Sequence, residues 1–232
     1  MKLLSISAFL ILAGVVGTGL SGCRKEDAAA AKAMAKGRVP IVPVTVETRA
    51  DGLAYLPGAA TPFTGEALTP HPDTPWLVKL KEPYAEGKRD GDKLELFKNG
   101  DTKSLRRYEK GTPKYAATFH KNGKKKYEVN LNAEDRGEGP YSRWYDTGVL
   151  EATAGLDSEE RWHGDFKEWT KEGVLKTHHV FKHGLLQQII FETPESQAAR
   201  KEKGVELQTS TETPASSAKQ VPAISVPPNN EK

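Results

Sequence analysis

The sequence predicts an all-β protein, an elongated and twisted antiparallel sheet built from consecutive β-hairpin repeats. Two observations predict this fold. Glycines recur between residues 91 and 184 at fixed distances from aromatic residues and leucines. Around the central glycine of each unit, apolar and polar residues alternate, as the two faces of a strand require. Self-similarity at a fixed period indicates a repeat architecture in which each unit is one supersecondary element.

Four units align on a central glycine, and these glycines are 23, 25 and 25 residues apart. The central glycines are Gly100, Gly123, Gly148 and Gly173. The last unit, HGDFKEWTKEGVLKTHHVFKHG, has the fullest pattern, with Gly164, Trp169, Gly173, Phe181 and Gly184. Other residues replace a glycine of this pattern in the middle units, and other turn types are expected there; the departures are Lys114, Glu134 and Glu159.

Each unit is expected to form one hairpin with a single core-facing side. Asn99-Gly100 and Asn122-Gly123 are dipeptides that favour tight turns with both residues at positive φ. The alternation then predicts the two sets of residues that share a face. The sets are Leu150, Ala152, Ala154 and Leu156 in the third unit, and Lys125, Tyr127, Val129 and Leu131 in the second.

Two groups of aromatic residues are candidates for the core or for a contact surface. Trp144 and Trp169 occupy the same repeat position, which predicts that they stack in the core. Tyr141, Arg143 and Tyr145 lie on the face opposite Trp144, and Phe166 lies on that face in the next unit. This row is either a second buried layer or a partner-binding surface, because aromatic residues and arginine are enriched at binding hot spots.

The repeats resemble a known family, the MORN-type repeats in the bacterial variant found in antitoxins of the YwqK type. HGDFKEWTKEGVLKTHHVFKHG and EGPYSRWYDTGVL are similar to the repeat of that family, and PFTGEAL at residues 62 to 68 looks like its lead-in. The resemblance covers roughly residues 50 to 192. It implies a hairpin-repeat scaffold, and an antitoxin role only if the protein stays in the cytoplasm.

The amino terminus predicts export and lipid anchoring. Residues 1–22 have an early lysine, an apolar run and small residues, which is the layout of a secretory signal peptide. Leu20-Ser21-Gly22-Cys23 fits the bacterial lipobox, so Cys23 is the expected lipidation site. An uncleaved anchor or a chance cysteine is the alternative. Cys23 is the single cysteine of the chain, which excludes an intramolecular disulfide.

The remaining segments divide the chain further. Residues 23–43 are expected to be a membrane tether, and residues 44–192 the repeat domain, with an early strand pair turning at Asp51-Gly52. Thr193-Pro194 predicts the start of a short helix within residues 193–208. The Pro- and Ser-rich residues 209–232 are expected to be disordered.

Charge is divided unevenly between the two halves of the array. Residues 79–126 carry 15 Lys and Arg against 7 Asp and Glu, whereas residues 127–174 carry 5 against 12. Such asymmetry predicts that the basic half attracts anionic partners. Lys124, Lys125 and Lys126 are the candidate contact residues. A solvated surface without an anionic partner is the alternative.

Catalytic and metal sites are not expected. His178 and His179 point to opposite faces of a strand, and His183 lies about 13 Å from His179 on an extended chain, so the three histidines cannot share one ion. The acidic run at residues 157–160 is expected to be a solvated turn. No nucleophile, nucleotide-binding or metal motif is present in the sequence, and no cofactor is expected.

The sequence therefore predicts a non-enzymatic scaffold or binding module, lipid-anchored to the cell membrane or outer membrane and facing the periplasm or exterior. Its expected partners are a protein or an anionic lipid or polymer of the envelope, and no nucleic acid. An antitoxin-like or immunity-like inhibitor of a partner protein is the first alternative. An envelope glycan-processing enzyme is the second.

Overall fold

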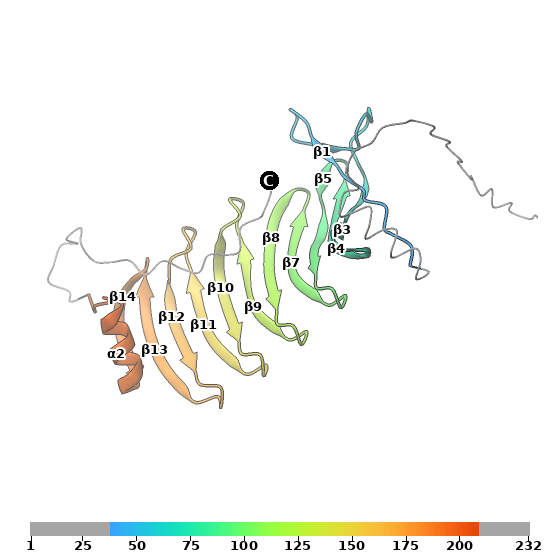
Figure 1. Cartoon of the computed structure of the whole chain (residues 1–232). Helices are drawn as coiled ribbons and strands as arrows, with labels where there is room; N and C mark the ends of the chain where they lie inside the picture. Colours follow the sequence, from blue (N-terminus) through green and yellow to red (C-terminus); the bar gives the residue numbers. More distant parts are fainter. Residues whose placement is uncertain (1–37, 209–232) are drawn as a thin grey trace, which may run out of the picture.

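The structure, a computed structural model, describes residues 38–208, and most of these residues form β-strands (Figure 1). The first strands are β1 (Glu47–Thr48), β2 (Ala54–Tyr55), β3 (Gly65–His71), β4 (Thr74–Ala85) and β5 (Lys88–Arg89). The repeat strands are β6 (Gly91–Leu96), β7 (Thr102–Glu109), β8 (Thr112–Phe119), β9 (Lys125–Leu131), β10 (Gly137–Trp144), β11 (Leu150–Leu156), β12 (Gly164–Trp169) and β13 (Leu175–Lys182). The carboxyl-terminal elements are β14 (Leu185–Glu192) and helix α2 (Pro194–Glu202).

The strands form one long antiparallel sheet in which sequence neighbours are spatial neighbours. Its order runs β14-β13-β12-β11-β10-β9-β8-β7-β6-β4-β3, and β5 pairs with β4 at the side of this path. Strands β1 and β2 pair separately, with Gly52 at positive φ in their turn, as expected. Figure 1 shows the curved strands side by side across the long axis of the array. The predicted fold, an extended sheet of consecutive hairpins, is confirmed.

The turns within the four repeats are three-residue turns, not the two-residue Asn-Gly turns expected from the sequence. In the first, the Gly100 amide donates to the Phe97 carbonyl and the Phe97 amide donates to the Asp101 carbonyl. Gly100 has a φ of 91°, whereas Asn99 is not among the residues at positive φ. A type I turn closed by one left-handed residue fits the strand twist, so a single glycine suffices. Asn99 contributes through its side chain, which accepts a hydrogen bond from the Asp101 amide.

The turns between repeats lie at the opposite edge of the sheet and show how the missing glycines are replaced. Lys110-Gly111 and His183-Gly184 are two-residue turns with both residues at positive φ. In the two middle turns, the left-handed position is filled by Asp135 and Glu160. The departures at Glu134 and Glu159 therefore alter these turns, and the left-handed residue follows each of them by one position. The expectation is wrong for Lys114, which lies within β8 and not in a turn.

Successive turns are also connected to one another along the array. The His120 imidazole bonds to the Trp144 carbonyl, and the Tyr145 hydroxyl donates to the Trp169 carbonyl. At the other edge, the Asn132 amide side chain donates to the Ser158 carbonyl. Each of these bonds joins corresponding turns of adjacent repeats, so the second, third and fourth hairpins are fixed to one another beyond the strand ladder.

A β-bulge recurs at the same place in every repeat and changes which side chains share a face. The strand pairing skips one residue in each hairpin, and the skipped residues are Lys103, Lys126, Glu151 and Lys176. A bulge of this kind places two residues opposite one and re-aims the side chains around it. The alternation predicted for Tyr127, Val129 and Leu131 is confirmed by their burial. The alternation is wrong for Lys125, which bonds to Glu128 on the other face.

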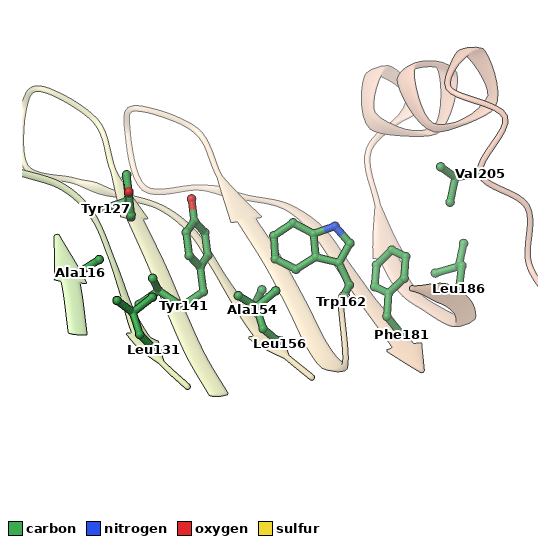
Figure 2. Close-up of a cluster of buried hydrophobic side chains, with 11 residues drawn as sticks. Ala116, Tyr127, Leu131, Tyr141, Ala154, Leu156, Trp162, Phe181, Leu186 and Val205 are labelled. Carbon is green, nitrogen blue, oxygen red and sulfur yellow. The ribbon is translucent and has the colours of Figure 1, made fainter. Parts of the chain in front are cut away.

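The apolar core lies along one face of the sheet, where aromatic rings follow each other from strand to strand (Figure 2). Tyr127, Tyr141, Trp162, Phe166 and Phe181 form this row, with successive ring centroids 5.2–6.1 Å apart. Offset and edge-to-face contacts at such distances stabilise beyond simple burial. The row ends at Leu186 and Val205, under helix α2.

The expectation that Trp144 and Trp169 stack in the core is wrong. Both side chains are only half-buried and neither belongs to the buried cluster. In each hairpin the β-bulge lies opposite the step into the tryptophan, between Arg143 and Trp144 and between Glu168 and Trp169. Lys125, on the face away from the core, lies over the Trp144 ring. Trp162, which lies between repeats and outside the glycine pattern, is the buried tryptophan, with 7% of its surface exposed.

Helix α2 and the residues after it close the carboxyl-terminal end of the sheet. Thr193 is the N-cap and accepts a hydrogen bond from the Ser196 amide, and Pro194 begins the helix. Beyond the helix, Leu207 bridges to Leu186 of β14, the last strand. In residues 38–208, no helix has the length and apolar character needed to cross a bilayer.

Candidate binding groove

A groove of about 620 Å³ lies where the apolar row gives way to charged residues, over strand β4 and strands β6 to β9. Its central part continues the core face: Ala116 and Tyr127 belong both to the buried cluster and to the groove wall. Toward β6, the equivalent positions are Arg106 and Lys93, which pair across the strands. The sheet therefore changes from an apolar face to a basic one within two strands.

The groove is strongly basic. Six basic side chains line it against one acidic side chain, Glu95. The basic residues are Lys79, Lys93, Lys103, Arg106, Lys121 and Lys126. Lys103 and Lys126 are bulge residues, so the repeated bulge turns two lysines into the groove.

Three of these cations are held in ion pairs. Lys93 Nζ lies 2.9 Å from Glu82, and Lys103 Nζ lies 2.8 Å from Glu95. Arg106 pairs with Asp135, which belongs to the next turn along the sheet. These pairs fix the side chains and partly neutralise the floor of the groove.

The other three cations are available to a ligand. Lys79, Lys121 and Lys126 are exposed, and none of them forms an ion pair within residues 38–208. A lysine ammonium on a flexible stem is a mobile point charge that adapts to a phosphate or carboxylate. The net positive charge of the groove is therefore carried by these three exposed lysines.

Two hydroxyl groups add hydrogen-bonding capacity. Thr118 Oγ1 in the groove wall is buried and has no hydrogen-bond partner in the described part of the chain. An unpaired buried hydroxyl costs stability, so it marks a place where a ligand oxygen gains a bond. Burial raises the pKa of Tyr127 to about 12, which keeps its phenol protonated at neutral pH.

The three candidate lysines from the sequence have different surroundings. Lys126 lines the groove. Lys124 reaches the next turn, where its ammonium donates to the Thr147 carbonyl at 2.5 Å. Lys125 pairs with Glu128 at 2.5 Å and lies over the Trp144 ring. Only Lys126 of this run therefore faces the groove, and the bulge that decides this has no signal in composition or charge.

The row of Tyr141, Arg143, Tyr145 and Phe166 is brought together by the sheet, mostly in the interior. Tyr141 is 3% exposed within the aromatic row, and the partly buried Phe166 packs against the buried cluster to which Tyr141 belongs. Arg143 lies between Glu151 and Glu168, with a 2.9 Å contact to Glu151. The sequence left open whether this row is a buried layer or a partner-binding surface. Tyr141 and Phe166 belong to a buried layer, whereas Arg143 and Tyr145 are half-buried at the edge of that layer.

The other candidate positions are also accounted for. His178 contacts Asp165 and His179 contacts Glu192, so the two histidines have separate partners. Cys23, the predicted lipidation site, lies outside the described residues, as do the tail beyond residue 208 and most of the predicted tether. A scan against protein-family models finds no match, and no curated protein matches the chain. The resemblance to MORN-type repeats stays a prediction.

Proposed function

We propose that this protein is a lipid-anchored, non-enzymatic repeat module of the bacterial cell envelope that binds anionic phospholipid or acidic envelope polymer in its basic groove. The observation that carries the proposal is the groove itself, with Lys79, Lys121 and Lys126 exposed and unpaired within the described residues. The charge division in the sequence supports it, because the strand order keeps the basic half at one end of the sheet.

The repeat architecture supports a binding role over a catalytic one. Acid and base catalysis requires titratable groups placed together where burial or neighbours tune their pKa. The charged groups of the groove are instead mostly cations, three paired with single carboxylates and three unpaired within residues 38–208, which suits recognition of an anion. Contacts to such an anion are electrostatic, so they are screened beyond about 8 Å at physiological salt.

The anchor supports a place at the envelope. The signal-like residues 1–22 and the lipobox ending at Cys23 predict export followed by acylation. Several acyl chains hold a protein stably at a membrane, whereas one chain does not. Changing Cys23→Ser tests this part: the variant should leave the membrane fraction or accumulate as a precursor, and normal processing and membrane retention would contradict it.

The groove is tested by co-sedimentation of the chain lacking residues 1–23 with vesicles that contain anionic phospholipid. Lys126→Glu should weaken binding about fivefold or more, since each lysine near an anionic surface contributes about 1 kcal/mol. Lys124→Glu is the matched control, because it makes the same charge change in the same turn region outside the groove. A second control, Glu159→Lys with Glu160→Lys, alters the acidic half.

Binding should be strong at low salt and weak at high salt. Acidic polysaccharide replaces the vesicles in a parallel series and distinguishes a polymer ligand from a lipid one. The proposal fails if neither anion is bound at low salt, or if Lys124→Glu and Lys126→Glu weaken binding equally.

A further inference from the structure

Three potential metal ligands that are far apart in the sequence meet at the edge of the sheet near the carboxyl-terminal end. Asp157 begins the turn between β11 and β12, His163 precedes β12, and His183 lies in the turn between β13 and β14. One ligand atom from each residue lies within 4.8 Å of the others. The three come from adjacent repeats, so only the folded array brings them together.

The local backbone explains why these side chains converge. The His163 amide donates to the Gly155 carbonyl, and the Gly184 amide donates to the Trp162 carbonyl, which draws three chain segments side by side. His183 has a φ of 50°, a left-handed conformation that turns its side chain away from the ordinary strand direction. The imidazoles of His163 and His183 then lie with their ring centroids 5.0 Å apart.

The Arg161 guanidinium contacts two of the three ligand residues, in the place that a metal ion would take. His183 Nδ1 lies 2.8 Å from Asp157 Oδ2, and the Arg161 guanidinium lies 3.0 Å from the same oxygen. Arg161 also approaches His183 Nδ1, at 3.3 Å. The His163 imidazole makes no hydrogen bond within residues 38–208. A contact between Asp157 and His183 that only stabilises the turns does not explain why the His163 imidazole lies beside it.

The donor set is that of a borderline divalent ion. Two imidazoles and one carboxylate are ligands for zinc in sites with three protein ligands and an open fourth position. Zinc bonds of about 2.0 to 2.1 Å separate tetrahedral donors by about 3.4 Å, so modest side-chain rotations close the cluster. Both histidines are exposed and Asp157 is partly exposed, which leaves a path for the ion and for a fourth ligand.

We propose that Asp157, His163 and His183 form a binding site for a divalent transition metal of the zinc class, in which the ion displaces the Arg161 guanidinium. The bound ion ties the β11–β12 turn, the start of β12 and the β13–β14 turn together. This site is independent of the basic groove, which lies over β4 and β6 to β9. It stands whether or not the groove binds anions.

The test is zinc binding to the full-length chain, purified in detergent without a histidine tag and stripped with a chelator. One zinc ion per chain should bind in calorimetric titration, and it should raise the thermal midpoint, because an ion that binds only the folded state stabilises it. Magnesium, which prefers oxygen ligands, should not substitute for zinc.

Three variants remove one ligand each while preserving the turns. Asp157→Asn keeps the side-chain oxygen that accepts from the Glu159 and Arg161 amides. His183→Asn tolerates the left-handed backbone, and His163→Ala leaves a strand-compatible residue. Each should weaken zinc binding more than about tenfold. His178→Ala is the matched control, since it removes a histidine paired with an aspartate elsewhere.

Arg161→Ala gives a second, opposite readout. Removing the competing cation should strengthen zinc binding by about tenfold, whereas a merely structural cluster would lose stability without gaining affinity. The proposal is overturned if the full-length chain binds no zinc, if His163→Ala and His183→Asn bind it as wild type does, or if Arg161→Ala leaves the affinity unchanged.

Discussion

At the scale of single residues, Trp162 and Trp169 differ in what surrounds their indoles. Trp162 contacts the rings of Tyr141 and Phe166 and is 7% exposed. Trp169 is half-buried outside the core. Trp162→Ala should therefore cost about 3 to 5 kcal/mol, because it removes a large buried ring and leaves a cavity. Trp169→Ala should cost clearly less, and denaturant midpoints of the two variants measure the difference. Equal losses would contradict the placement of the core.

His179 makes stability depend on pH. Burial lowers the pKa of His179 and outweighs the Glu192 carboxylate 3.0 Å away, which acts in the opposite direction. The unfolded chain, with a histidine pKa of about 6.5, therefore takes up the proton first as pH falls. The stabilisation by neutral His179 is present above about pH 6.5 and is lost as pH falls toward the folded-state pKa.

His179→Gln should flatten the decline in unfolding free energy between about pH 7 and pH 5. Urea unfolding at a series of pH values measures it. An unchanged slope in His179→Gln would show that another group is responsible.

At the scale of the elements, the approach between β11 and the segment before β12 depends on Gly155. A Cβ atom added there would lie 2.2 Å from the His163 carbonyl oxygen, and backbone cannot yield as a flexible side chain can. Gly155→Ala should therefore destabilise the protein by more than about 2 kcal/mol, as overpacking does when the backbone must shift. Thr153→Ala in the same strand should change stability within about 0.5 kcal/mol. Thermal unfolding of both variants provides the comparison.

The sequence was informative about hairpins and uninformative about bulges. Gly100 and its equivalents mark the turns because the left-handed conformation there excludes most side chains, which leaves a visible signal. A bulge needs no special residue: Lys103, Lys126 and Glu151 occupy it in different repeats. Because one extra residue re-aims the side chains around it, the faces of Trp144 and Lys125 could not be predicted from alternation alone.

The candidate sites follow the same division. The excess of basic residues in the first half of the array was visible in the sequence, and it accounts for the positive charge of the groove. That Lys126 faces the groove while Lys125 does not was invisible, for the reason just given. The meeting of His163 and His183 depends on strand register, which joins residues 20 positions apart.

At the scale of the whole molecule, the segment after β14 protects the end of the sheet. Leu186 is 1% exposed beneath Val205, and Arg200 holds the buried Glu192 carboxylate at 3.0 Å. A chain truncated after Glu192 loses this cover, which exposes the apolar surface and leaves the carboxylate without its Arg200 partner. Terminal elements of repeat arrays are needed for solubility for this reason.

The truncated chain should unfold at a lower temperature and aggregate, as measured by calorimetry and size-exclusion chromatography. A chain truncated after Gln208 keeps all the contacts of residues 38–208 and is the control. If both truncated proteins are as stable as the full chain, helix α2 and the residues after it do not close the array.

The orientation of the strands has a mechanical consequence. Because they lie across the long axis and pair in sequence order, a force that pulls residues 38 and 208 apart loads one strand ladder at a time. The hydrogen bonds of that ladder open in succession, as in a zipper, and do not share the load as they would in shear. Each released hairpin of about 25 residues adds about 80 to 90 Å of extended chain. Between a membrane and a partner, such an array would lengthen in steps under tension and spare its attachments.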